Sequence, residues 1–168
     1  MNQAKIRNLH IDPTVVMGRD TVIGEEGFYW QRDDKGVLHS KPHEFGVIIN
    51  EDVVLGSHVS VNSGRWRDTV IGRGTKIDNH SHISHNVIIG KHCFISVGVI
   101  LLGSCEIGDY CNIWSGAIIH QGVKVGDRST VGAGTYLRRN IVNDSTVYGT
   151  GKHQVYTFGA RKIDKVDV

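Results

Sequence analysis

The side chains best suited to chemistry lie between Asp78 and Asn86, in the run DNHSHISHN. An imidazole, with an ordinary pKa of about 6.5, accepts a proton near neutral pH, so His85 is a candidate general base. Eighteen residues later stands Gly103, where a backbone N–H without a side chain could stabilise an oxyanion. A base and such a donor are what acyl transfer from a thioester requires.

Neighbouring polar groups could support this base. Either Asn86 or a backbone carbonyl could hold the imidazole of His85 in one tautomer, and His82 adds another polar side chain nearby. The simpler alternative is that His85 is an ordinary surface side chain at a turn. The choice depends on whether the fold brings His85 and Gly103 together.

A six-residue repeat predicts that it does. The chain carries an aliphatic residue at every sixth position, without insertion, at Ile71, Ile77, Ile83, Ile89, Ile95, Leu101, Ile107, Ile113, Ile119, Val125, Val131 and Leu137. The positions four residues later hold mostly small side chains, from Thr75 to Ile141. A period of six fits neither a helix nor an alternating strand, and it is typical of short parallel strands wound into a β-helix. The predicted fold class is therefore all-β.

In a parallel β-helix of this kind, three hexads form one triangular coil of eighteen residues, and the coils stack about 4.8 Å apart. The aliphatic side chains fill the interior, and the small ones leave room for them. His85 follows the interior residue Ile83 by two positions, so it lies at a corner and points outward. Gly103 occupies the same corner of the next coil.

The three cysteines, Cys93, Cys105 and Cys111, all fall in the small interior position of the repeat. This placement indicates buried small side chains and disfavours nucleophiles, metal ligands or a disulfide framework. Unpaired interior cysteines are compatible with a reducing cytoplasm, where we expect the protein to reside.

The chain reads as one domain, 1–168, with a β-helix over 11–142 and a cap or tail over 143–168. An aromatic and charged stretch at 27–46 interrupts the repeat and predicts a protruding hairpin or loop. A second interruption, of four residues, lies around Gly64–Arg67. Such interruptions either carry function or are tolerated insertions. The basic residues of the tail either belong to a cap or contact phosphate.

Composition narrows the function classes. The chain has 19 Lys and Arg against 17 Asp and Glu, a net charge of +2, which gives no electrostatic argument for nucleic-acid or membrane-surface binding. No apolar run reaches the roughly 18 residues of a membrane span, and the first residues lack the apolar core of a signal peptide.

Three segments resemble the UDP-3-O-acylglucosamine N-acyltransferase family, whose members acylate an amine in lipid A synthesis. They are Gly27-Phe28 at the start of the loop, RDTVIG at 67–72, and IDNHSHISHNVIIG at 77–90. The resemblance runs from Gly27 to about Gly134 and implies that His85 is the general base and Gly103 the oxyanion donor. The sister O-acyltransferase has a similar His-Ile-Ala-His-Asp element, matched here at 82–86 with Asn in place of the acid.

The chain departs from that family in three respects. We expect it to lack the N-terminal domain that grips uridine and the C-terminal helices associated with carrier protein, and the family's second His is displaced here to His120. The chain is also similar to nucleotide-amino-sugar N-acetyltransferases of surface-polysaccharide pathways. That resemblance implies a left-handed parallel β-helix, a homotrimer with active sites between neighbouring prisms, and acetyl-CoA as donor.

Together these resemblances predict N-acylation of a nucleotide-linked amino sugar in lipopolysaccharide or surface-polysaccharide synthesis, with acetyl-CoA or another acyl-CoA preferred over acyl-carrier protein and with O-acylation left open. The residues expected along the donor are Gln121, Arg138, Arg139 and Lys152. The residues expected to bind the acceptor are His82, Tyr29, Arg65, Trp66 and Arg67. No metal is expected.

Two other function classes remain open. Trimeric β-helix carbonic anhydrases hold a metal with histidines that include a His-x4-His pair, and His80 and His85 have that spacing. Their phase in the hexad differs from that family's pair, however. The other alternative is a β-helix scaffold without catalysis.

Overall fold

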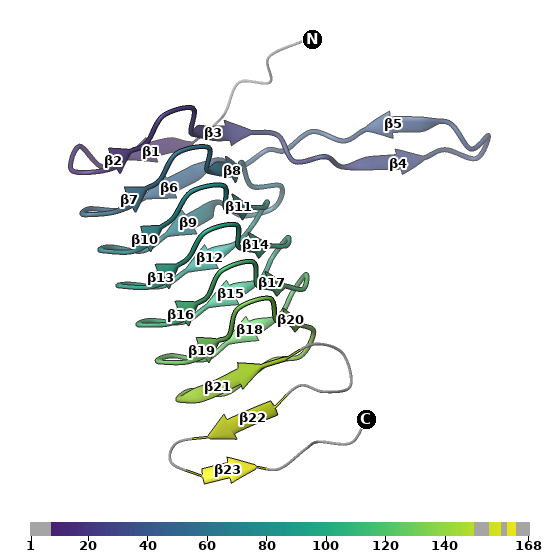
Figure 1. Cartoon of the computed structure of the whole chain (residues 1–168). Coiled ribbons are helices and arrows are strands. Elements are labelled where there is room, and N and C mark those ends of the chain that lie inside the picture. Colours follow the sequence, from purple (N-terminus) through teal and green to yellow (C-terminus); the bar gives the residue numbers. More distant parts are fainter. Residues whose placement is uncertain (1–7, 150–154, 159–160, 164–168) are drawn as a thin grey trace.

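The computed structural model describes residues 8–149, 155–158 and 161–163, and in this part of the chain all regular structure is β. Short parallel strands form three sheets, one on each face of a triangular stack of coils (Figure 1). The first sheet contains β1 (Leu9–Ile11), β6 (Val47–Ile49), β9 (Thr69–Ile71), β12 (Ile88–Ile89), β15 (Glu106–Ile107) and β18 (Lys124–Val125). The second contains β2 (Val16–Met17), β7 (Val54–Leu55), β10 (Lys76–Ile77), β13 (Phe94–Ile95), β16 (Asn112–Ile113), β19 (Thr130–Val131), β21 (Ser145–Tyr148), β22 (Val155–Phe158) and β23 (Arg161–Ile163). The third contains β3 (Val22–Glu25), β8 (Ser60–Asn62), β11 (His82–Ile83), β14 (Ile100–Leu101), β17 (Ile118–Ile119) and β20 (Tyr136–Leu137).

Strand pairing confirms the eighteen-residue coil. Ile83 of β11 pairs in parallel with Leu101 of β14, and Leu101 pairs with Ile119 of β17. Each strand therefore hydrogen-bonds to its equivalent one coil later, and the predicted parallel β-helix is correct. Past the last coil, β21, β22 and β23 pair antiparallel and extend the second sheet toward the C-terminus.

The interior is filled as the repeat predicts. Every aliphatic residue of the series from Ile71 to Leu137 is at most 3% exposed. Cys93, Cys105 and Cys111 are free thiols buried in the same core. Burial raises the pKa of the Cys105 thiol to about 12, so the nucleophilic thiolate is absent at neutral pH. The interpretation of the cysteines as packing residues is confirmed.

Each prism edge is made by tight turns. We call the edge where a third-sheet strand turns into the next first-sheet strand the third corner; it contains the turns from β11 to β12 and from β14 to β15. Asn86 and Ser104 have positive φ angles of 63° and 64° in these two turns. Asn tolerates this left-handed conformation better than most residues, which suits it to the position after His85.

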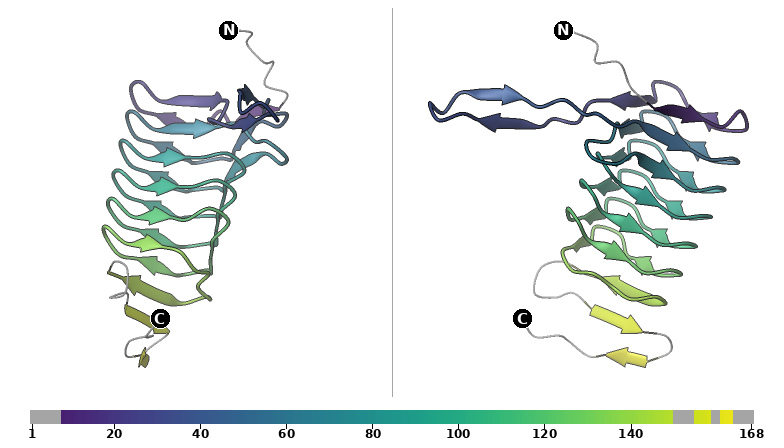
Figure 2. Two further views of the ribbon diagram at one scale, coloured as in Figure 1. Left: turned by 90° about the vertical axis from the view of Figure 1, so that its right-hand side faces the viewer. Right: turned by 180° about the vertical axis from the view of Figure 1, so that it is seen from behind.

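The irregularities of the coils gather at the third corner. Between β3 and β6 the chain leaves the stack as an antiparallel hairpin of β4 (Trp30–Arg32) and β5 (Leu38–Ser40), which projects from the N-terminal end of the stack (Figure 1 and Figure 2). Between β8 and β9 the turn is four residues longer than usual, because Val61 pairs with Ile83, 22 positions later. After β20 the turn is two residues shorter, because Val131 pairs with Val147, 16 positions later.

The shorter last turn corrects one detail of the sequence interpretation. The repeat placed Ile141 in the small interior position. In the structure Ile141 forms a parallel bridge with Val125, which is an aliphatic position of the previous coil. The phase of the repeat therefore changes after Leu137, and the second sheet continues through β21 beyond residue 142.

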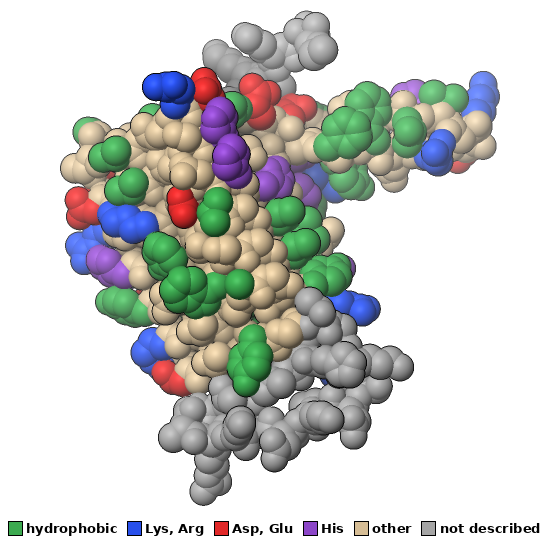
Figure 3. All heavy atoms as spheres, in the orientation of Figure 1, with side chains coloured by type: hydrophobic (Ala, Val, Ile, Leu, Met, Phe, Trp, Pro, Cys, Tyr) green, Lys and Arg blue, Asp and Glu red, His purple; other side chains and the backbone are tan. Residues whose placement is uncertain are grey.

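The hairpin, called the arm below, carries exposed apolar side chains, including Phe28 at its base, which is 95% exposed, and Leu38, which is 47% exposed. The space-filling view shows apolar side chains along the arm, and histidines near the place where it leaves the stack (Figure 3). No helix in the described part of the chain is long and apolar enough to cross a membrane.

Candidate active site

His85 and Gly103 lie one coil apart at the third corner and are in direct contact. Ser104 donates its backbone N–H to the carbonyl oxygen of His85 at 2.9 Å, which holds the two turns in register. A Cβ atom built on Gly103 would lie 2.6 Å from His85 Cε1 and 2.7 Å from His85 Nε2. The imidazole therefore fills the space that a side chain at position 103 would need.

Asn86 fixes the tautomer of His85. The Nδ1 atom of His85 lies 2.7 Å from Asn86 Oδ1. Asn86 is fully buried, and its Nδ2 donates to the carbonyl oxygen of Arg67 at 2.8 Å, so the amide oxygen faces the imidazole. Because that oxygen only accepts, Nδ1 carries the ring proton and Nε2 keeps its lone pair. Of the two supports considered from the sequence, the structure uses Asn86.

The electrostatic environment keeps His85 neutral. Burial lowers its pKa below the ordinary value, and the hydrogen bond to Asn86 offsets part of that effect. The positive charge of Arg65, and that of His43 when it is protonated, lower the His85 pKa further. At neutral pH the ring is therefore an unprotonated base with its lone pair on Nε2.

Three residues from the two interruptions of the repeat surround the His85 ring. The rings of His43 and Trp66 meet it edge-on, with centroids 5.4 Å and 5.6 Å away. A Cβ atom built on Gly27 would lie 3.3 Å from His85 Cδ2 and 2.6 Å from His43 Cε1. Glycine at 27 thus leaves room for two imidazoles to approach each other.

His43 and the role of Gly27 were not predicted from the sequence. Both residues lie in or beside the arm, where the six-residue rhythm is absent and gives no register. Two sequence signals pointed to this segment without giving these roles: the interruption of the repeat at 27–46 and the Gly27-Phe28 match to the acyltransferase family.

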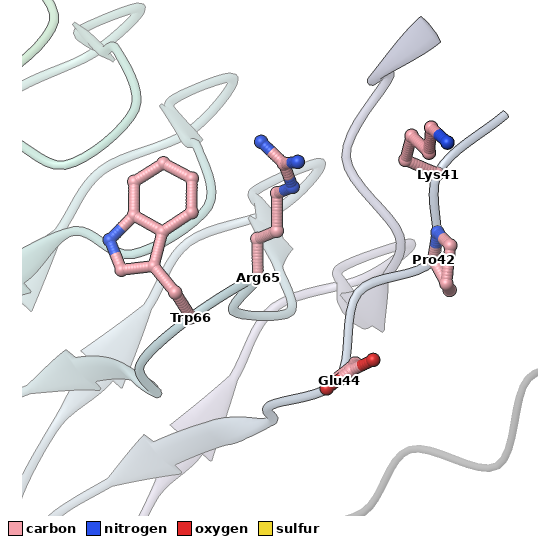
Figure 4. A pocket seen from close by; sticks show the side chains of 5 residues that line it. All are labelled: Lys41, Pro42, Glu44, Arg65 and Trp66. Carbon is pink, nitrogen blue, oxygen red and sulfur yellow. The ribbon is translucent and has the colours of Figure 1, made fainter. Parts of the chain in front are cut away.

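A pocket of about 370 Å³ opens beside these rings, lined by Lys41, Pro42, Glu44, Arg65 and Trp66. The Arg65 and Trp66 side chains come from one segment and face Lys41, Pro42 and Glu44 on another (Figure 4). The Arg65 guanidinium also stacks on Tyr29, with its Cζ 3.6 Å from the ring centroid. Two of the predicted acceptor-binding residues, Arg65 and Trp66, thus line this pocket, and a third, Tyr29, stacks on Arg65.

Arg67, also predicted to bind the acceptor, lies outside the pocket lining. Its Nη1 forms an ion pair with Glu106 at 2.9 Å, and its Nε donates to the carbonyl oxygen of Asn86 at 3.0 Å. Hydrogen bonds from Lys124 and Arg67 lower the pKa of Glu106, which keeps it ionised. Arg67 therefore supports the turn that carries Asn86, because its guanidinium is occupied by these partners.

His82 lies on strand β11, three residues before the corner, with Nδ1 2.7 Å from Ser60 Oγ. Burial lowers the pKa of His82, so it too is neutral at neutral pH. It does not line the pocket, and a contact between His82 and the acceptor stays a prediction.

The pair His80 and His85 is separated by the fold. His80 lies in the turn before β11 and stacks on His58 with centroids 5.0 Å apart, whereas His85 lies in the turn after β11. The two rings therefore occupy different corners of the prism. Within the described residues of one chain, no three His, Cys, Asp or Glu side chains are grouped to hold a metal ion.

The predicted donor path follows the same prism edge. Gly122 donates its backbone N–H to the carbonyl oxygen of Gly103 at 3.0 Å, which places Gln121 one coil beyond Gly103. Gln121, Arg138 and Arg139 are all exposed, the two arginines in the shortened turn after β20. Lys152 lies outside the described residues.

Comparison with known sequences supports the repeat. The family model described as "Bacterial transferase hexapeptide (six repeats)" matches residues 68–103 and 104–139. The probable UDP-3-O-acylglucosamine N-acyltransferase 2, mitochondrial, of Arabidopsis thaliana is 39% identical over 102 residues, covering 61% of this chain and 34% of the relative. The UDP-3-O-acylglucosamine N-acyltransferase of Methylorubrum extorquens (strain PA1) is 47% identical over 83 residues, covering 49% of this chain and 23% of the relative. The chain thus spans about a third or less of these relatives.

Solved structures share the fold at low sequence identity. A UDP-N-acetylglucosamine acyltransferase from Arabidopsis superposes with a TM-score of 0.76 at 18% identity, over 87% of this chain and 48% of that one. A perosamine N-acetyltransferase from Caulobacter crescentus, solved with CoA and GDP-perosamine, superposes with a TM-score of 0.57 at 19% identity, over 83% of this chain and 52% of that one. Residues 68–139 thus match the hexapeptide-repeat family of bacterial transferases, and the chain is similar to UDP-3-O-acylglucosamine N-acyltransferases over part of their length.

Proposed function

We propose that the protein transfers an acyl group from a thioester to the amine of a nucleotide-linked amino sugar. The observation that carries this proposal is the state of His85. Its Nδ1–H is held by Asn86, and its Nε2 lone pair lies against Gly103 at an outward corner. The match of residues 68–139, which include this corner, to the transferase hexapeptide family and the similarity to N-acyltransferases support the same reaction.

In the proposed reaction, His85 acts first as a base and then as an acid. The amine nitrogen attacks the thioester carbonyl while His85 Nε2 takes one of its protons, which gives a tetrahedral intermediate and an imidazolium. The C–S bond then breaks, and the departing sulfur receives the proton from His85. The intermediate's oxyanion is stabilised by a backbone N–H, the part proposed for Gly103. Gly103 is buried beneath the imidazole in the free protein, so this role stays a prediction.

The pocket beside His85 has the charges for such an acceptor. Lys41 and Arg65 stand on facing walls and provide two cations for a diphosphate, and the Glu44 carboxylate can accept hydrogen bonds from sugar hydroxyls. Trp66 lines the pocket and also contacts the His85 ring. A sugar lying over Trp66 would therefore bring its amine to the base.

For the donor we propose acetyl-CoA or another acyl-CoA that lies along the third corner past Gln121, with its phosphates near Arg138 and Arg139. Both arginines are exposed and available for phosphate. The likeness in fold to a perosamine N-acetyltransferase solved with CoA is compatible with this donor. We also propose that the protein assembles as a homotrimer with active sites between neighbouring prisms. The compartment that we propose is the cytoplasm.

The test is a panel of UDP-, dTDP- and GDP-linked amino sugars combined with acetyl-CoA, longer acyl-CoAs and acyl-carrier protein. Thiol release is followed together with the mass of the acylated sugar. At least one combination should give both, and His85→Ala should lower kcat by about 10²- to 10⁴-fold without unfolding the protein. His58→Ala, at a different corner, is the matched control and should keep full activity. Full activity in His85→Ala would place the base elsewhere.

A further inference from the structure

Three buried side-chain polar atoms in the described part of the chain lack a hydrogen-bond partner, and one of them belongs to His43, whose ring lies beside that of His85. His43 follows the arm and is only 7% exposed, although it stands between exposed Pro42 and Glu44. Its Nε2 atom is buried and has no hydrogen-bond partner in the described part of the chain. Buried polar atoms without partners are uncommon and costly, so this one calls for an explanation in function.

The other ring nitrogen of His43 determines its tautomer. Nδ1 lies 2.9 Å from the carbonyl oxygen of Ser63, which can only accept, so Nδ1 carries the proton. The backbone N–H of Gly27 points at the same nitrogen from 3.3 Å, but a protonated Nδ1 has no lone pair to accept it. The shorter contact therefore prevails, and Nε2 of His43 is a lone-pair acceptor.

Two imidazoles in the same tautomeric form thus lie side by side, those of His85 and His43. In His85 and in His43 the Nδ1–H is held by an oxygen, from Asn86 and Ser63 respectively, and each Nε2 is left as an acceptor. The two rings are nearly perpendicular, at 85°. A Cβ atom built on Gly27 would lie 3.4 Å from His43 Nε2 and 3.3 Å from His85 Cδ2, so Gly27 keeps the space between them free of a side chain.

We infer that His43 Nε2 is a second hydrogen-bond acceptor for the attacking amine, and that the pair His85 and His43 selects amines over hydroxyls. The inference rests on the proposed function. A primary amine has two N–H donors and one lone pair. One N–H can go to His85 and the other to His43, which aims the lone pair at the thioester carbonyl. A hydroxyl has one O–H, so one imidazole would stay unpaired and buried.

The acceptor must reach an atom that is enclosed in the free protein. The segment that carries His43 also forms a wall of the pocket, through Lys41, Pro42 and Glu44. An acceptor that enters the pocket therefore contacts residues on both sides of His43 in the sequence. We expect this segment to shift as the sugar binds, so that Nε2 meets the amine.

The kinetic test compares one amino sugar with the analogue that has a hydroxyl in place of the amine. His43→Phe keeps a ring against His85 but has no acceptor, and His43→Gln keeps an amide oxygen. In His43→Phe, kcat/KM for the amine should fall by about 10- to 100-fold, the value expected when one buried N–H of the bound amine is left without an acceptor. The donor KM and the activity on the hydroxyl analogue should change less than about threefold, and His43→Gln should recover most of the amine activity.

The second test does not depend on turnover. In the inactive His85→Ala protein, the ¹⁵N NMR signal of His43 Nε2 should shift when the amino sugar binds and stay in place with the hydroxyl analogue. Equal losses for amine and hydroxyl in His43→Phe, or no ¹⁵N shift with bound amino sugar, would show that His43 is only a packing residue. If the wild-type protein acylates no acceptor, the proposed function fails instead, and the NMR result still reports on His43.

Discussion

The imidazole of His85 leaves no room for a Cβ atom on Gly103, because Cε1 lies only 2.6 Å from the position that this Cβ would take. The base and the backbone beside it are therefore placed by one contact between successive coils. The strands on either side of that contact, β11 and β14, are in regular register. A change at either residue should affect the other directly.

The first prediction concerns Gly103→Ala. Its φ is not in the left-handed region, so the backbone tolerates alanine, but the new Cβ must push the imidazole away. We expect kcat to fall by at least about 10-fold and unfolding free energy by about 1–3 kcal/mol, as in other overpacked sites. In a His85→Ala background the same substitution should cost almost no stability, because the clashing ring is gone. A double-mutant cycle by urea unfolding checks this, and additive losses would contradict it.

The second prediction is the pH dependence. Since burial lowers the pKa of His85, kcat/KM should rise with pH along an acid limb centred below about 6.5. Asn86→Asp places a carboxylate on Nδ1–H, favours the protonated ring and raises the His85 pKa, so the limb should move to higher pH. A pH–rate profile with a fixed acceptor measures both midpoints. A limb that stays in place in Asn86→Asp would exclude His85 as the titrating base.

The third prediction separates two neighbouring arginines. Arg65 lines the pocket, so Arg65→Ala should raise the acceptor KM by about 10-fold or more, as expected for the loss of a charge-assisted contact. Arg67 instead holds Glu106 and the Asn86 carbonyl, so Arg67→Ala should lower kcat and leave the acceptor KM nearly unchanged. The partly exposed Arg67–Glu106 pair itself should add no more than about 1 kcal/mol to stability. Equal KM effects in the two variants would show that Arg67 also contacts the acceptor.

The fourth prediction concerns the thiols. Cys93, Cys105 and Cys111 are buried in the core, and the raised pKa of Cys105 leaves no thiolate at neutral pH. Ellman's reagent should therefore detect almost no thiol in the native protein and all three in denaturant. Rapid labelling of the folded protein would contradict the packing of these residues. The same experiment gives the background for thiol-release assays.

The repeat was sufficient to predict the fold and the contact between His85 and Gly103. Its register is independent of long-range detail, because each hexad must put its aliphatic side chain inside and each coil repeats the last. The same repeat predicted that Cys105 is buried, because this residue falls in the small interior position. It could not choose between Asn86 and a carbonyl as the partner of His85, because that depends on the orientation of a side-chain amide.

The contribution of His43 could not be predicted in the same way. It enters the site from an insertion of about twenty residues, and its distance from His85 depends on how the arm leaves the stack. The position of Arg67 outside the pocket lining could not be predicted for a related reason. Arg65, Trp66 and Arg67 share one four-residue insertion, and composition alone cannot tell which of them turn toward the pocket and which toward Glu106.

In the coils from β1 to β21, all changes of coil length fall at a single edge of the prism, and the other two edges keep their spacing. A segment can therefore be lengthened, shortened or exchanged at that edge while the aliphatic ladder inside continues undisturbed. Transplanting the arm, or the turn between β8 and β9, from one such protein into another should then transfer preference for an acceptor as a module. In this architecture, what the protein acts on and what keeps it folded can be altered separately.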